Sequence, residues 1–240
     1  MTPLFKEIDS QASPLGQISL RRRRIPVFGD RDIYEVKLGD EFLMSSMFVD
    51  AEEALSTLGL AAVKGDDLSV VVGGLGLGYT AVAALKDTRI AELLVVDALD
   101  AVIGWHKDEL VPLGTILNAD TRNRYVFGSF FDLAINPSKG FDPGCEGKKL
   151  DAILLDIDHS PTEFLNAANA SFYTTENLSL MAEQLKSKGV FAMWSQNLPE
   201  ESFESLLKTV FETVDSHVVS FFNPFQGNES TNSVYVCVKG

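Results

Sequence analysis

The chain has 240 residues, a length that fits one large domain or a domain with a smaller appendage. Hydrophobic residues make up 45% of the sequence and charged residues 22%, proportions that exclude disordered, collagen-like and low-complexity chains. Lys and Arg number 20 against 34 Asp and Glu, so the formal net charge is −14. This charge argues against nucleic acid or a membrane as a partner and leaves cationic small molecules open.

The cysteines and histidines show no pattern of a disulfide scaffold or a metal site. Cys145 and Cys237 are too few for such a scaffold, and neither they nor the three histidines have metal-ligand spacing. We expect two free thiols in a reducing compartment and no metal. The first thirty residues lack a long apolar stretch behind a basic start, which argues against a signal peptide, so the sequence predicts a cytoplasmic protein.

Residues 1–45 contain short alternating segments, among them 17–20 and 25–28, with turn residues at 29–32. This pattern predicts a small antiparallel β-hairpin region. Four arginines occupy residues 21–24, and strand geometry sends two of them to each face. Because the protein is acidic, we expect solvated or ion-paired arginines rather than an anion site.

From residue 50 onward the period changes, and apolar strands alternate with helical segments over residues 46–240. Residues 50–60 predict a helix with Asp50 as N-cap and Glu53 three residues on. Further strands are expected at 68–72, 93–96, 124–127, 152–155, 190–194, 217–221 and 234–238, and further helices at 79–85, 101–110, 175–185 and 200–211. This alternation implies an α/β domain with a largely parallel sheet and helices on both faces.

The strongest chemical signal is the glycine-rich loop that follows the strand 68–72. Its glycines are Gly73, Gly74, Gly76 and Gly78. Such a loop lets the backbone approach a ligand where a helix begins, although a tight structural turn can also require glycines. Asp97 ends the next strand, 19 residues after Gly78, near the offset at which an acid reaches a ribose hydroxyl. Together the two features predict a nucleotide-type ligand.

The glycine spacing bears on which nucleotide is bound. The register Gly74-x-Gly76-x-Gly78 is typical of S-adenosylmethionine-type sites, whereas the dinucleotide fingerprint fits only through Gly76-x-Gly78-x-x-Ala81. The strands after Asp97 also carry further acids, at positions where a dehydrogenase would have neutral residues in contact with the nicotinamide. A sulfonium nucleotide is therefore favoured over NAD.

A second group of ionisable residues follows the apolar strand 150–155. Asp156 stands where this strand ends, on the same sheet edge as the glycine loop and Asp97, and Asp158 and His159 follow in the loop. A carboxylate at this edge can hold a cationic amine and accept its proton as it attacks an activated carbon. Asp156 is therefore the candidate catalytic base. Asp158 and His159 remain open between a share in catalysis and a structural or exposed-loop role.

The order of these motifs resembles the spermidine synthase family, a branch of the class I S-adenosylmethionine-dependent methyltransferase fold. The resemblance extends from about residue 33 to the end and includes the segments 172–176 and 189–194. It implies a Rossmann-like domain with a mostly parallel seven-stranded sheet over residues 46–240, preceded by the hairpin region 1–45.

The resemblance also implies roles for individual residues. Asp97 matches the family's ribose-binding acid, and Asp156 matches the aspartate implicated as base and amine holder. Gly128 and Ser129 match a Gly-Asp step whose aspartate contacts adenine, so adenine would lie near Ser129 and Phe130.

Several positions depart from the family pattern. Gly76 stands where the family loop has an aspartate that holds the amino group of the aminopropyl donor. The family's Asp-Glu-Phe survives at residues 40–42, but Met44 and Ser45 replace the tyrosine and histidine that contact the polyamine. Ser129 replaces the adenine aspartate. The nucleotide-binding frame is thus retained while the substrate has changed.

The leading hypothesis is a spermidine synthase-like transferase that uses S-adenosylmethionine or decarboxylated S-adenosylmethionine as co-substrate. It would transfer an aminopropyl or methyl group to a cationic amine or another small nucleophile, and the resemblance connects it with polyamine biosynthesis. Two alternatives stay open: a non-catalytic nucleotide-binding or regulatory homologue, and an NAD-type oxidoreductase. Family members commonly form homodimers, but the residues themselves leave the oligomeric state open.

Overall fold

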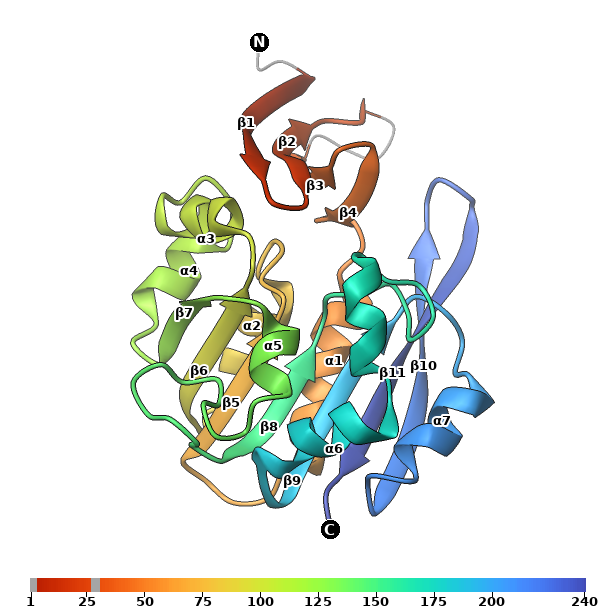
Figure 1. Cartoon of the computed structure of the whole chain (residues 1–240). Coiled ribbons are helices and arrows are strands. Elements are labelled where there is room, and N and C mark those ends of the chain that lie inside the picture. The colour runs from red at the N-terminus through yellow and green to blue at the C-terminus, as the bar shows by residue number, and fades with distance from the viewer. Residues whose placement is uncertain (1–3, 27–30) are drawn as a thin grey trace.

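A computed structural model describes residues 4–26 and 31–240 of the chain, whose strands form two sheets (Figure 1). The predicted segment 25–28 and the turn at 29–32 fall largely outside the described residues.

The first sheet has four antiparallel strands in the order β1-β2-β3-β4. They are β1 (Phe5–Ser13), β2 (Gly16–Arg23), β3 (Ile33–Leu38) and β4 (Glu41–Ser45). The predicted hairpin region is thereby confirmed, although the largely exposed β1 escaped prediction. The arginines at 21–24 form ion pairs with Glu7, Asp32 and Glu35, as expected. The division into domains at residue 45 stays a prediction.

The second sheet has seven strands in the order β10-β11-β9-β8-β5-β6-β7. They are β5 (Leu68–Gly73), β6 (Ile90–Asp97), β7 (Asn123–Phe127), β8 (Leu150–Leu155), β9 (Leu185–Ser195), β10 (Thr213–Asn223) and β11 (Asn228–Val238). Strands β5 to β9 pair in parallel, and β11 is antiparallel to both of its neighbours. This is the predicted mostly parallel seven-stranded sheet.

Helices cover both faces of this sheet (Figure 1). They are α1 (Asp50–Ala62), α2 (Tyr79–Leu85), α3 (Asp100–Lys107), α4 (Gly114–Ala119), α5 (Phe130–Ala134), the 3₁₀ helix η2 (Ala167–Phe172), α6 (Thr175–Glu183) and α7 (Glu201–Leu207). Successive strand residues point to opposite faces, so Val70 and Val72 join the core beneath α1 and α2, whereas Val71 joins the core beneath α5 and α6.

The start of α1 differs from the prediction by one residue. Its N-cap is Val49, and no side chain caps the helix, so the predicted capping role of Asp50 is wrong. Asp50, Glu52 and Glu53 instead form an acidic first turn, and negative charge at the amino end of a helix interacts favourably with the helix dipole.

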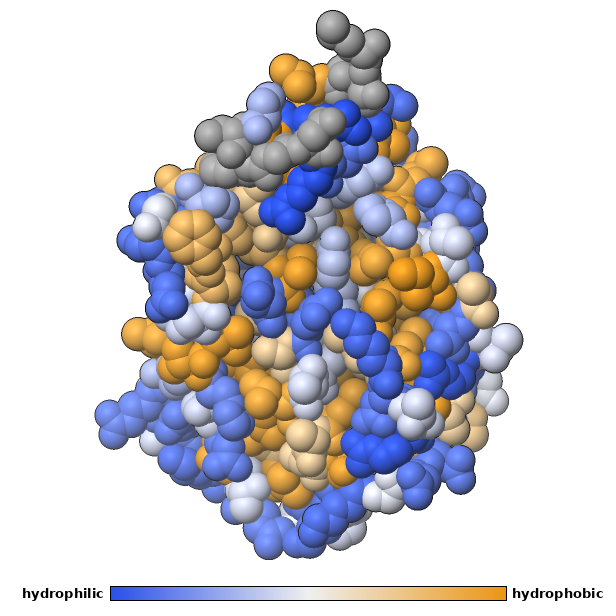
Figure 2. Space-filling model, turned by 180° about the vertical axis from the view of Figure 1, so that it is seen from behind, coloured by the Kyte–Doolittle hydropathy of each residue, from blue (hydrophilic) through white to orange (hydrophobic). Residues whose placement is uncertain are grey.

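The surface mixes hydrophilic and hydrophobic side chains on the face drawn in Figure 2. Of the helices in the described part of the chain, none combines the length and the apolar character needed to cross a bilayer. Cys145 is exposed and Cys237 is buried, and both are free thiols, as predicted.

Candidate functional site

A cavity of about 740 Å³ lies where the carboxyl ends of β5, β6 and β8 face the four-stranded sheet. Its volume falls within the roughly 300–1,000 Å³ typical of small-molecule sites. Seven of the ten predicted site residues line it: Gly74, Gly76, Asp97, Ser129, Phe130, Asp156 and His159. The other three, Gly73, Gly78 and Asp158, are not among its lining residues. Segments far apart in the sequence therefore meet around one space.

The glycine loop brings the backbone to the floor of this cavity. Gly74 has φ +94°, and a Cβ there would lie 2.0 Å from the carbonyl oxygen of Asp156, so only glycine allows the ends of β5 and β8 to approach this closely. Gly76 has φ +47°, and a Cβ there would lie 2.8 Å from the Sδ of Met44. Met44 thus covers the position where the resemblance had led us to look for an aspartate.

His106 supports the loop from below. Its Nε2 lies 3.0 Å from the carbonyl oxygen of Gly76, and burial lowers the pKa of the imidazole to about 4. The ring is therefore neutral near pH 7, and the contact requires the tautomer in which Nε2–H donates to the carbonyl. His106 is thus a buried packing residue that also fixes the loop.

Asp97 stands at the end of β6 with its carboxylate held by backbone amides. Leu75 N–H donates to Oδ2 at 2.9 Å, and Leu99 N–H donates to Oδ1 at 2.8 Å. Burial raises the pKa of this carboxyl, and the backbone hydrogen bonds oppose that shift. A carboxylate offers about four acceptor sites, so Asp97 keeps acceptor capacity for a ligand hydroxyl.

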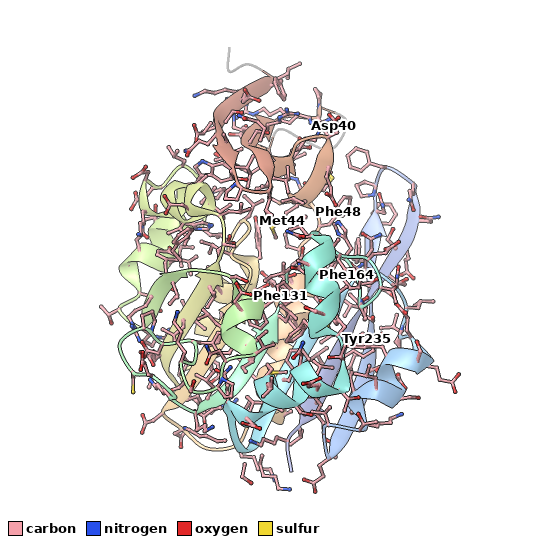
Figure 3. All side chains as sticks on the ribbon, in the orientation of Figure 1. Asp40, Met44, Phe48, Phe131, Phe164 and Tyr235 are labelled. Atoms are coloured by element: carbon pink, nitrogen blue, oxygen red, sulfur yellow. The ribbon has the colours of Figure 1, made fainter. Side chains whose placement is uncertain are left out.

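Helix α5 presents an aromatic wall to the cavity. Ser129 is its N-cap and accepts a hydrogen bond from Asp132 N–H at 3.2 Å. Phe130 is only 1% exposed and packs against Phe141 and Phe172, so its contribution to the wall is mainly structural. The half-buried Phe131, labelled in Figure 3, also lines the cavity, although the sequence analysis did not single it out.

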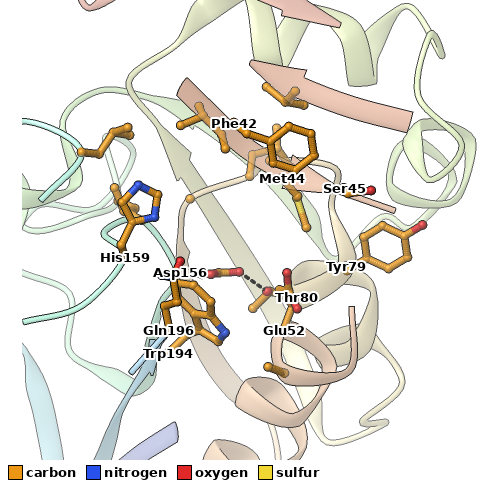
Figure 4. A pocket seen from close by; sticks show the side chains of 18 of the residues that line it. Phe42, Met44, Ser45, Glu52, Tyr79, Thr80, Asp156, His159, Trp194 and Gln196 are labelled. Carbon is orange, nitrogen blue, oxygen red and sulfur yellow. Dashed lines mark hydrogen bonds between the residues drawn. The ribbon is translucent and has the colours of Figure 1, made fainter. Parts of the chain in front are cut away.

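Asp156 and Glu52 form a pair of carboxyl groups on one wall of the cavity, beside Thr80 (Figure 4). Thr80 Oγ1 donates a hydrogen bond to Asp156 Oδ2 at 2.6 Å. Burial raises the pKa of Asp156 to about 6. Burial and the charge of Asp156 raise the pKa of Glu52 to about 8. The sequence analysis missed Glu52, which was considered only as part of a helix start.

Asp158 has a different environment from Asp156 and His159, the two residues with which the sequence analysis grouped it. It is 2% exposed and accepts hydrogen bonds from Leu165 N–H, Asn169 Nδ2 and Tyr173 OH, each at 2.8 Å. Its oxygens hold the segment after β8 together and do not face the cavity. This placement removes the geometric basis for a catalytic role and favours the structural alternative.

His159 links the core to the four-stranded sheet. Its Nε2 lies 2.7 Å from Glu41 Oε1, so the loop after β8 contacts β4 at the edge of the cavity. Both side chains remain partly exposed, and His159 itself lines the cavity. The geometry thus brings His159 to the site without bonding it to Asp156.

The carboxyl-terminal strands supply a further wall of the cavity. Asn223 and Gln226 from the β10–β11 hairpin line the cavity. Trp194 packs against the core and also lines the cavity, Phe221 lines it as well, and Phe222 is 64% exposed. The indole N–H of Trp194 is buried and has no partner among the described residues.

The charges that line the cavity are almost all negative. The carboxyl groups belong to Asp50, Glu52, Asp97 and Asp156, and no lysine or arginine stands among the described lining residues. In the described ranges, 4–26 and 31–240, no group of three or more His, Cys, Asp or Glu side chains could hold a metal ion. The cavity therefore suits a ligand with positive charge.

Comparisons with known proteins agree with this architecture. No protein-family profile and no curated protein sequence matches the chain. Among solved structures, a spermidine synthase in complex with the transition-state analogue AdoDATO matches with a TM-score of 0.72 and 17% sequence identity, covering 98% of this chain and 74% of the other. The spermidine synthase from Thermotoga maritima matches with a TM-score of 0.73 and 16% identity, covering 98% and 73%.

These likenesses show a spermidine synthase-like fold and thereby confirm the fold predicted from the sequence. They lend no support to the regulatory or the NAD-dependent alternative. At 16–17% identity they concern the fold alone.

Proposed function

We propose that the protein is a spermidine synthase-like alkyltransferase that binds a sulfonium nucleotide and transfers an alkyl group to an amine. The observation that carries the proposal is the meeting of the glycine loop, Asp97 and Asp156 around one cavity of suitable size. The likeness to spermidine synthases, one of them bound to a transition-state analogue, supports the same reading.

The charge of the cavity favours decarboxylated S-adenosylmethionine as the donor. S-adenosylmethionine carries a carboxylate beside its ammonium group, whereas the decarboxylated form has only the ammonium. The described lining residues include four carboxyl groups and no lysine or arginine that could pair with a ligand carboxylate. Like charges close together in a half-buried site repel strongly, so aminopropyl transfer is favoured over methyl transfer.

The residues that line the cavity would bind different parts of the nucleotide. Gly74 and Gly76 form the backbone turn that borders the nucleoside, Asp97 accepts hydrogen bonds from the ribose hydroxyls, and Ser129 with the aromatic wall of α5 borders the adenine. Holding donor and acceptor in line supplies most of the rate enhancement, because positioning converts a bimolecular step into an effectively unimolecular one.

Asp156 has the properties of the base. The amine nitrogen forms a bond to the carbon attached to the sulfonium sulfur while the carbon–sulfur bond breaks. The electron pair of that bond stays on sulfur as a neutral thioether, and the amine's proton passes to Asp156. With its pKa raised to about 6, Asp156 is mainly ionised near pH 7 and remains a better proton acceptor than an ordinary aspartate.

Calorimetry and product analysis test the proposal. We expect decarboxylated S-adenosylmethionine to bind more tightly than S-adenosylmethionine, and we expect methylthioadenosine to form when an aliphatic amine is added. Tighter binding of S-adenosylmethionine together with S-adenosylhomocysteine as product would refute aminopropyl transfer. Nucleotide binding with no product from any amine would favour the regulatory alternative, and enhanced fluorescence of bound NADH would favour the oxidoreductase.

A further inference from the structure

Glu52 is directed into the cavity by its position on α1. Residues four apart share a helix face, and Ser56, four residues after Glu52, is fully buried and donates a hydrogen bond to the carbonyl oxygen of Thr80 at 2.7 Å. The face of α1 that carries Glu52 is therefore fixed against Thr80. The next residue, Glu53, turns outward and pairs with the exposed Lys86 at 3.4 Å.

Thr80 also fixes the second carboxyl group. Its hydroxyl donates to Asp156 Oδ2, which leaves Oδ1 of Asp156 without a hydrogen bond in the described structure. Figure 4 shows Glu52, Thr80 and Asp156 gathered at the same wall. Two carboxyl groups, from α1 and from the end of β8, are thus brought together by one threonine.

The pair has no counter-ion among the described residues. The titratable groups near Glu52 are Asp156 beyond β8, Asp50 and the outward-turned Glu53 on α1, and Tyr79 on α2, and Asp97 and His159 line the same cavity farther around. None of the described ion pairs includes Glu52 or Asp156. Burying two carboxylates without a cation is unfavourable, and such groups are normally paired.

We propose that Glu52 is a ligand-binding residue, and that its carboxylate and that of Asp156 together bind a primary ammonium group of the donor or the acceptor substrate. A primary ammonium has three N–H donors and no acceptor, which matches Asp156 Oδ1 and the Glu52 oxygens. In the described part of the chain no third His, Cys, Asp or Glu completes a metal-holding group with them. The inference rests on the proposed function for the identity of the two substrates.

A proton-linkage effect should accompany this binding. Near pH 7 the Glu52 carboxyl is mainly protonated, because its pKa is raised to about 8. An ammonium group binds the ionised carboxylate, so its arrival expels up to about one proton. A residue with only a structural role would not release a proton when an amine binds.

Isothermal titration calorimetry at pH 7 tests the inference on the full chain, with Glu52→Gln compared with Glu53→Gln as a matched neighbour. The ligands are methylthioadenosine, which has no ammonium, decarboxylated S-adenosylmethionine, and 1,4-diaminobutane added with and without methylthioadenosine. We expect E52Q to bind methylthioadenosine as the wild type does and to bind at least one ammonium ligand about 10- to 100-fold more weakly. Whichever ligand loses affinity is the source of the ammonium group.

Titrations in phosphate and in Tris buffers measure the proton release, which should vanish in E52Q and persist in E53Q. Wild-type affinity of E52Q for both ammonium ligands would overturn the inference, as would equal binding of 1,4-butanediol and 1,4-diaminobutane. Failure of methylthioadenosine to bind the wild type would instead refute the proposed function, while the diamine titration of the ligand-free protein still tests Glu52. Glu52→Asp, which keeps the charge, should retain part of the amine affinity if E52Q folds poorly.

Discussion

Replacing Glu52 with glutamine should stabilise the ligand-free protein, and the gain should grow with pH. In the folded chain, burial and Asp156 raise the pKa of the Glu52 carboxyl from 4.5 to about 8. A carboxyl group with a raised folded-state pKa contributes stability that is complete below its unfolded pKa and is lost as pH rises through its folded pKa. The window for this loss is therefore about pH 4.5 to 8.

The size of the effect follows from the linkage slope. Within the window, the folded state binds up to one more proton than the unfolded state, which lowers the free energy of unfolding by about 1.4 kcal/mol per pH unit. Between pH 5.5 and 8 the wild type should thus lose roughly 3 kcal/mol that E52Q retains. Glutamine has nearly the same shape, so contacts of the α1 backbone and of Ser56 are kept.

Urea unfolding followed by far-UV circular dichroism at several pH values measures this difference. The contributions of all other titrating groups to the pH dependence of stability cancel when the variant is compared with the wild type. E53Q serves as the control because Glu53 is exposed and paired with Lys86. Parallel pH dependences of stability in E52Q and wild type would refute the reasoning, because they would mean that Glu52 is ordinarily solvated.

Further substitutions test the other parts of the site. Asp156→Asn should lower the transfer rate about 10²- to 10⁴-fold while methylthioadenosine binding persists. The transfer rate of the wild type should rise as pH increases through about 6. An unchanged rate of the variant in a product assay would exclude Asp156 as the base. Asp97→Asn should weaken methylthioadenosine binding about tenfold or more by calorimetry, because a charged acceptor is lost; equal affinity would remove Asp97 from the ribose site. Gly76→Ala should lower the free energy of unfolding in urea by on the order of 1–3 kcal/mol, because φ is +47° and the Cβ would meet Met44. Combining it with Met44→Ala should relieve the contact but not the backbone strain. If the effects of the two substitutions on stability are additive in the double variant, the packing of Met44 on Gly76 is contradicted.

The fold and three anchor points of the site could be predicted because they depend on local patterns. A buried strand that ends in glycines, followed by strands ending at Asp97 and Asp156, places these residues at one edge of any parallel sheet. The carboxyl ends of parallel strands meet at one edge of the sheet whatever the conformation of the loops that follow them. The largely exposed β1 and the short α4 and α5 lack such patterns and were missed.

The direction of side chains beyond the strand ends could not be predicted in the same way. Asp156 and Asp158 are two residues apart, but the chain leaves the strand at Leu155, so the alternation of faces no longer applies. The partners that turn Asp158 inward, Asn169 and Tyr173, lie 11 and 15 residues downstream in a segment with no regular period. Only the folded structure separates the two aspartates into a cavity residue and a structural one.

Glu52 illustrates why charge placement in a site requires tertiary information. From the sequence it is one of three acids in a helix start, a position that the helix dipole alone explains. Its pairing with Asp156 arises because α1 packs on α2 through Ser56 and Thr80, while Thr80 also reaches the end of β8. Two half-buried acids held together in this way destabilise the ligand-free chain, and a bound ammonium group would offset that cost, so the arrangement is better explained by a cationic ligand than by folding.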